Sequence, residues 1–140
     1  VAELAAASDR IVVVAVEAVG AGRTLADPGD PDAGIVTQLV TARVERALDD
    51  GATGTLVIEQ ESTLLDGTPI VVNGLPPLTA GDQGVAFLVA GDSEEFPYHA
   101  LVNEQAWLPF DGDVIRTTGT DAVRSAWDGR TVDELDDAVP

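Results

Sequence analysis

The sequence of 140 residues has no cysteine, no methionine and no lysine, and its one histidine is His99. Without cysteine the chain has no disulfide, no thiolate nucleophile and no cysteine-ligated metal. A single histidine cannot supply a multi-histidine zinc site, and no nucleophile motif accompanies it. These absences remove the commonest catalytic centres, and we expect a non-enzymatic protein with no catalytic residue.

Long hydrophobic runs are also missing. The longest is Ile11–Val16 ("IVVVAV"), far short of the roughly 20 residues that a membrane-spanning helix needs, so we expect no membrane insertion. The run predicts one buried strand. Hydrophobic residues still make up 45% of the chain, enough for the core of one domain of this length, and we expect residues 1–140 to form a single domain.

Basic charge is scarce. Seven basic residues, all arginine, are set against 25 acidic residues, which gives a net charge of −18. This charge repels phosphate backbones and anionic membrane surfaces, so nucleic-acid binding is not expected. It is compatible with the codon bias of a GC-rich genome, which is the ordinary explanation, and with adaptation to high salt, and the two origins stay open.

The first residue is Val1, and no methionine is present to serve as a start. Either an export signal has been removed or the chain is a domain excised from a longer protein. We favour the first reading and expect an extracellular or cell-surface location. The absence of disulfides is no obstacle to export at this size, because the hydrophobic core is large enough to stabilise the fold.

What the sequence does contain is a succession of apolar strands divided by turn residues. Strands are expected at residues 11–19, 35–48, 55–61, 68–74, 85–91 and 98–103, with a hairpin over 107–118. The second strand is long enough to bend or bulge, and a long loop over residues 20–34 is expected before it. Asp111-Gly112 predicts a type I′ hairpin turn, and Pro109 predicts an edge strand.

Short helices are expected at both ends of the chain. "VAELAAAS" favours a helix at the N-terminus. "TDAVRSAWDG" predicts a second helix with Thr120 as N-cap, Val123 and Trp127 on one face and Gly129 as its stop. "TVDELDDAV" predicts a third helix, with Thr131 and Glu134 in the spacing of a capping box. The strands then occupy about residues 9–117 and the C-terminal helical segment about residues 120–139.

The fold class indicated is mainly β, an antiparallel OB-like barrel with a short N-terminal helix and two short C-terminal helices. "ASDRIVVVAVEAV", "VTARVERALDDGATGTLVIEQ" and "GLPPLTAGDQGVAFLV" carry the resemblance. Together these segments resemble uncharacterised bacterial exported OB-like domains, and their spacing is similar to that of netrin-like and tissue-inhibitor-type barrels, over residues 4–103. The inhibitor type implies an N-terminal cysteine that chelates a protease's zinc, and Val1 cannot do this.

The stretch "LADPGDPDAG", residues 25–34, is the one candidate metal site. Asp30 and Asp32, with Asp27 nearby, begin like a calcium loop, yet the third ligand position is Gly34 and the twelfth position falls on Thr41. We therefore expect a hairpin loop first and an ion site second. No cofactor is expected, and calcium is the one ion left open.

Two other groups of residues are candidates for a functional role. Aromatic side chains are few, and Tyr98, Trp107 and Phe110 are the predicted ligand-binding patch. Carboxylate pairs such as Glu59 with Glu61, or Asp111 with Asp113, are the candidates for an acidic-site hydrolase, although no apolar pocket is evident to raise a pKa.

The function indicated is therefore a non-enzymatic exported binding or structural module, whose partner is a protein or a cell-envelope component. The alternatives are a calcium-binding surface domain and, less favoured, an acidic-site hydrolase.

Overall fold

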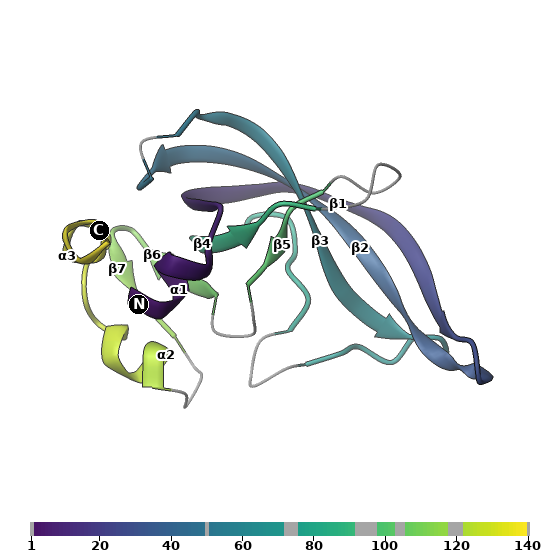
Figure 1. The fold of residues 1–140 in the computed structure, drawn as a ribbon. Coiled ribbons are helices and arrows are strands. Elements are labelled where there is room, and N and C mark those ends of the chain that lie inside the picture. The colour runs from purple at the N-terminus through teal and green to yellow at the C-terminus, as the bar shows by residue number, and fades with distance from the viewer. Residues whose placement is uncertain are drawn as a thin grey trace.

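The computed structural model describes residues 2–49, 51–71, 76–91, 98–102, 106–117 and 122–139. The protein is mainly β, with one antiparallel sheet of seven strands and three short helices (Figure 1). The elements in chain order are α1 (Ala2–Ala7), β1 (Arg10–Asp27), β2 (Asp30–Ala47), β3 (Gly54–Leu64), β4 (Gln83–Val89), β5 (Ala100–Leu101), β6 (Trp107–Asp111), β7 (Val114–Ile115), α2 (Ala122–Trp127) and α3 (Val132–Ala138). Among the described residues, no helix is both long enough and apolar enough to pass through a membrane.

The first part of strand β1, Ile11–Val16, is buried on both faces, as its apolar run predicts. Side chains of a strand alternate between the two faces of the sheet. Ile11 and Val13 therefore join one hydrophobic core, with the helices, while Val12, Val14 and Val16 join a second core, inside the curve of the sheet. The antiparallel partner β4 alternates in the same way, since Phe87 faces the first core and Leu88 the second.

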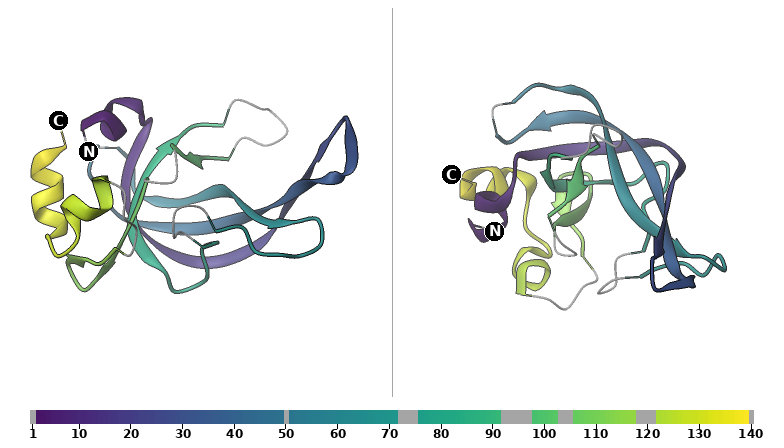
Figure 2. Two further views of the ribbon diagram at one scale, coloured as in Figure 1. Left: turned by 90° about the horizontal axis from the view of Figure 1, so that it is seen from below. Right: turned by 45° about the vertical axis from the view of Figure 1, so that its right-hand side comes forward.

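The expected long loop over residues 20–34 is wrong. Strands β1 and β2 continue to a two-residue turn, because Asp27 pairs with Asp30 across Pro28 and Gly29. Gly22 stands at a register shift of β1, where a side chain would not fit, because a Cβ on it would lie 2.2 Å from Thr37 Oγ1. Register shifts along both ladders let the long strands bend, as expected for β2. The hairpin therefore projects beyond the rest of the sheet (Figures 1 and 2).

The sheet is not closed, so the predicted OB-like barrel is not confirmed. The strand order is β3-β2-β1-β4-β6-β7, and β5 pairs with β4. Between β3 and the start of β5 there is only an isolated parallel bridge, from Ile58 to His99. It consists of two hydrogen bonds, Glu59 N–H to His99 O at 2.7 Å and His99 N–H to Val57 O at 3.0 Å.

The helices gather at one end of the sheet, together with both chain termini (Figure 2). Leu4 of α1, Trp127 of α2 and Leu135 of α3 are buried in the first core. The predicted capping box of α3 is confirmed, since the Thr131 side chain accepts from Glu134 N–H and the Glu134 side chain accepts from Thr131 N–H. The predicted N-cap of α2, Thr120, lies outside the described residues.

The predicted hairpin of β6 and β7 is present, one residue out of register. Asp111 pairs with Val114, so Gly112 and Asp113 form the turn in place of Asp111-Gly112. Gly112 takes a φ of +69°, which L side chains rarely adopt. The predicted edge position of Pro109 is wrong, because β6 lies between β4 and β7. The carbonyl oxygen of Pro109 accepts from Arg116 N–H at 2.8 Å.

Trp107 of β6 packs against the backbone of β4. A Cβ on Gly84 would lie 2.5 to 2.9 Å from three ring atoms of Trp107, closer than side-chain atoms approach one another. Glycine at this position therefore lets the indole lie against the strand. Trp107 is only 2% exposed and belongs to the second core.

We expect Gly84→Ala to lower the free energy of unfolding by about 1–3 kcal/mol, the usual cost of overpacking a core. Urea unfolding of this variant, of the control variant below and of the wild type would measure the change in the free energy of unfolding. The matched control is Gly20→Ala on β1, where an added Cβ meets nothing within 4 Å and the change should stay within about 0.5 kcal/mol. Equal effects at the two glycines would contradict the packing of Trp107 on Gly84.

Candidate ligand-binding cavity

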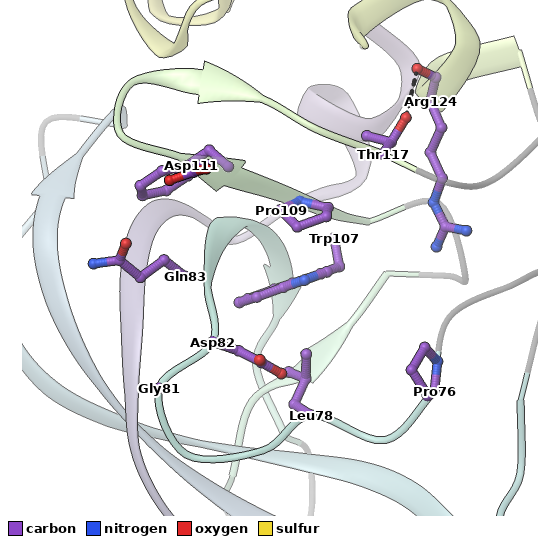
Figure 3. Close-up of a pocket in the computed structure, with 11 residues that line it drawn as sticks. Pro76, Leu78, Gly81, Asp82, Gln83, Trp107, Pro109, Asp111, Thr117 and Arg124 are labelled. Carbon is purple, nitrogen blue, oxygen red and sulfur yellow. Dashed lines mark hydrogen bonds between the residues drawn. The ribbon is translucent and has the colours of Figure 1, made fainter. Parts of the chain in front are cut away.

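A cavity of about 440 Å³ lies beside β6, between the loop that precedes β4 and helix α2 (Figure 3). The described residues that line it are Pro76, Leu78, Gly81, Asp82, Gln83, Trp107, Pro109, Phe110, Asp111, Thr117 and Arg124. They come from segments that are distant in sequence, and the sheet brings them together. Apolar and aromatic side chains with a few polar groups are the usual lining of a small-molecule site.

The loop over residues 76–82 forms one wall of the cavity, and side-chain amides hold it in place. The Gln38 side chain donates to Leu78 O at 2.9 Å, and the Leu78 N–H donates to the Gln60 side chain at 2.9 Å. Gln38 also donates to Gln60 at 3.0 Å. Further along, Gly81 N–H donates to Val16 O and Val16 N–H donates to Asp82 O. The wall is therefore fixed to β1, β2 and β3 before any ligand binds.

The cavity brings together two of the three aromatic residues predicted to bind a ligand. Trp107 and Phe110 both line it. Tyr98 is described and partly buried, and it is not one of the lining residues. The ring of Trp107 lies beneath Pro109 at the cavity (Figure 3), and because it is almost fully buried only its border is accessible there.

Arg124 is the one cation among the described lining residues. It stands on α2, is 3% exposed, and its guanidinium extends toward the space between Trp107 and Pro76 (Figure 3). Thr117 fixes the backbone of α2 here, because its hydroxyl donates to Arg124 O at 3.1 Å. Burial of a guanidinium is costly unless it is paired, and Arg124 has an interaction within the chain that offsets this cost.

Two carboxylates also line the cavity, Asp82 and Asp111. Asp82 stabilises its own loop by accepting from Thr79 N–H at 2.9 Å. Asp111 is exposed, at the end of β6. In Figure 3 it lies at the side of the cavity opposite Arg124, with Pro109 and Trp107 between them.

The carboxylate of Glu59 on β3, one of the predicted hydrolytic pair, forms an ion pair with Arg23 of β1. Arg23 of β1 donates to it through Nε at 2.8 Å and Nη2 at 2.9 Å, and the Thr37 hydroxyl donates at 2.8 Å. Partial burial raises the pKa of Glu59, but the hydrogen bonds from Arg23 and Thr37 and the charge of Arg23 outweigh it, so the pKa lies below its ordinary value. A general acid needs the opposite shift.

The candidate calcium residues lie at the tip of the β1–β2 hairpin. Asp27 and Asp30 pair across the turn, and Asp30 is exposed. The side chains of Asp27 and Asp32 lie outside the described residues. Where side chains are described, no group of three or more histidine, aspartate or glutamate residues is arranged to hold a metal ion.

Sequence reasoning missed Arg124 and the loop wall at residues 76–82. Arg124 stands three residues before Trp127, a spacing that puts both on one face of a helix, so the amphipathic pattern of "AVRSAW" contained the signal. The loop carries no periodic pattern of its own. Its position depends on Gln38 and Gln60, polar residues at inward positions of β2 and β3.

Comparison with known proteins found no matching family model, no similar curated protein and no similar solved structure. The function therefore has to be argued from the geometry of the chain itself.

We expect Glu59→Gln to destabilise the protein in a pH-dependent way. The lowered pKa of Glu59 means that its ion pair contributes stability above its ordinary pKa of 4.5 and loses it as the pH falls through the folded-state pKa. At neutral pH the variant should lose about 1 kcal/mol of the free energy of unfolding. Hydrogen bonds to a charged group are worth about 1.5–3 kcal/mol, and solvent screening of the partly exposed Arg23 reduces this contribution. Urea unfolding from pH 7 to pH 3 measures it, with exposed Glu61→Gln as the matched control. A difference between wild type and Glu59→Gln that is independent of pH would contradict this.

We expect the hairpin tip to respond to ionic strength alone. A sample in EDTA serves as the reference. Relative to it, the midpoint temperature of unfolding should rise equally in calcium chloride, magnesium chloride and sodium chloride of matched ionic strength, each without EDTA. The reason is that screening relieves the repulsion of a net charge of −18. A larger rise with calcium that disappears in the double variant Asp30→Asn and Asp32→Asn would instead establish a specific calcium site at the turn.

Proposed function

We propose that the protein is a non-enzymatic binding module that acts outside the cell, and that its ligand occupies the cavity beside Trp107. The observation that carries this proposal is the cavity itself. Its volume of about 440 Å³ is within the range of small-molecule sites. Hydrogen bonds from Gln38 and to Gln60 fix its loop wall, so little ordering of that wall is needed on binding.

We infer an OB-like relationship for the strands β1 to β5, and their order supports it. Strands β1 to β5 follow the order β3-β2-β1-β4-β5, and the His99 bridge links the first and last of them in parallel. Five strands in such an arrangement form a partly open barrel whose faces and loops bind ligands in unrelated proteins. This analogy concerns architecture, and the choice of ligand depends on the site.

Several features support binding over catalysis. The one histidine of the described chain, His99, takes part in the structure through its backbone, which forms the bridge to Ile58 of β3. The Glu59 carboxylate is engaged by Arg23 and Thr37, and its pKa is lowered. An acid catalyst would need a raised pKa and a pocket around it.

The partner that we propose is a protein or a cell-envelope component that presents a small apolar group to the cavity. The net charge of −18 supports a partner other than nucleic acid. A cavity of this size accepts one such group rather than an extended polymer, so the recognised part is a terminal or side group.

The test is a titration with phenylpropanol, a neutral apolar probe, followed through the indole N–H signals of the two tryptophans by NMR. We expect the signal of Trp107 to move and that of Trp127, in the first core, to stay. Phe110→Leu should weaken binding several-fold because it removes part of the aromatic wall.

Tyr98→Leu is the matched control and should bind as the wild type does, since Tyr98 does not line the cavity. If neither phenylpropanol nor its acid and amine analogues move the Trp107 signal, the proposed function fails.

A further inference from the structure

Arg124 differs from the other arginines in its burial. Five arginines, Arg10, Arg23, Arg43, Arg46 and Arg130, meet carboxylates at 2.6 to 3.2 Å in half-buried or exposed positions. Arg116 is exposed. Arg124, at 3% exposure, is the buried charged residue of the described chain, and it stands in a cavity wall.

We propose that the cavity binds a monocarboxylate with an apolar body, the carboxylate meeting the Arg124 guanidinium and the body lying among the apolar lining residues, beside Trp107. This inference rests on the proposed function and specifies its ligand. A guanidinium has five donors in a planar fork that matches a carboxylate, and it is less strongly hydrated than an ammonium. Arg124 has a further interaction within the chain, and the fork accommodates more than one acceptor.

The apolar part of the ligand follows from what lies next to Arg124. Its guanidinium extends toward the space between Trp107 and Pro76, and Leu78 lines the same part of the cavity (Figure 3). A carboxylate at Arg124 therefore brings whatever it is attached to against apolar walls. A flat or extended hydrocarbon body buries its surface there, whereas a polar body would lose its hydration without compensation.

The two acidic lining residues limit the ligand to one negative charge. Asp82 and Asp111 belong to the same cavity, and Asp111 lies opposite Arg124 in Figure 3. A second carboxylate would approach one of these aspartates, and like charges repel strongly where water is partly excluded. Dicarboxylates and phosphates are thereby disfavoured against a monocarboxylate.

The experiment compares four probes of one shape on the full chain by calorimetry and by the Trp107 indole signal. They are phenylpropionate, phenylpropanol, phenylpropylamine and phenylsuccinate. We expect phenylpropionate to bind about tenfold more tightly than the alcohol, because a charge-assisted hydrogen bond is the stronger kind. The amine and the dianion phenylsuccinate should both bind more weakly than phenylpropionate.

Two variants locate the preference. Arg124→Gln should remove the tenfold advantage of the acid over the alcohol. Asp111→Asn changes an exposed side chain, so the fold should persist, and it should strengthen phenylpropionate binding about twofold by removing a repulsive charge. If Arg124→Gln does not fold, the inference is still tested by the relative affinities of the four probes for the wild type and by the effect of Asp111→Asn on phenylpropionate binding.

Equal binding of acid and alcohol, or a preference for the amine or for phenylsuccinate, would overturn the inference and leave the cavity as a binding site. No binding of any probe would remove the proposed function as well. The two failures are therefore distinguishable.

Discussion

The burial of β1 on both of its faces is the constraint on which the rest of the structure depends. Alternate residues of the run Ile11–Val16 enter two separate cores, so both sides of this strand need a cover. Helices α1, α2 and α3 supply one cover, and the curved part of the sheet with Leu78 supplies the other. Each fully buried valine of this run, such as Val12 and Val14, contributes about 1.5 kcal/mol or more to stability.

The cavity follows from the same arrangement. The loop over residues 76–82 covers the inner core where no strand is available, and the amides of Gln38 and Gln60 replace the backbone partners that a neighbouring strand would offer. Because a buried polar group is costly unless it is paired, these glutamines determine where the loop lies. On the other side, the indole of Trp107 fits against Gly84 and gives the cavity its apolar wall.

Local patterns in the sequence predicted most of the strands and the capped helix, because alternation and capping are properties of neighbouring residues. Ile11–Val16, the bent β2 and the capping box at Thr131 are examples. The strand expected at residues 68–74 is wrong over its described part, where there is only an isolated bridge between Thr63 and Pro69. The strand expected at residues 98–103 is reduced to β5, Ala100–Leu101. The expected loop over residues 20–34 was wrong because glycine, aspartate and proline were taken as turn residues, whereas cross-strand contacts such as Gly22 with Thr37 place most of them in the ladder.

The candidate site was predicted only in part. Trp107 and Phe110 were identified as an aromatic pair, and both line the cavity. The inclusion of Arg124 depends on how α2 packs, and that of Asp82 on how its loop attaches to β1. Contacts between segments so far apart leave no periodic signal in a single sequence.

The two neighbours of β1 differ greatly in how far away they are along the chain, and this bears on the order of events during folding. The partner β2 follows after a two-residue turn, so this hairpin can form on the microsecond timescale. The partner β4 pairs Arg10 with Leu88, and this requires closure of a loop that contains most of the sheet. We therefore expect the projecting hairpin to form before the core that anchors it, and the pairing of β4 with β1 to be the slower step.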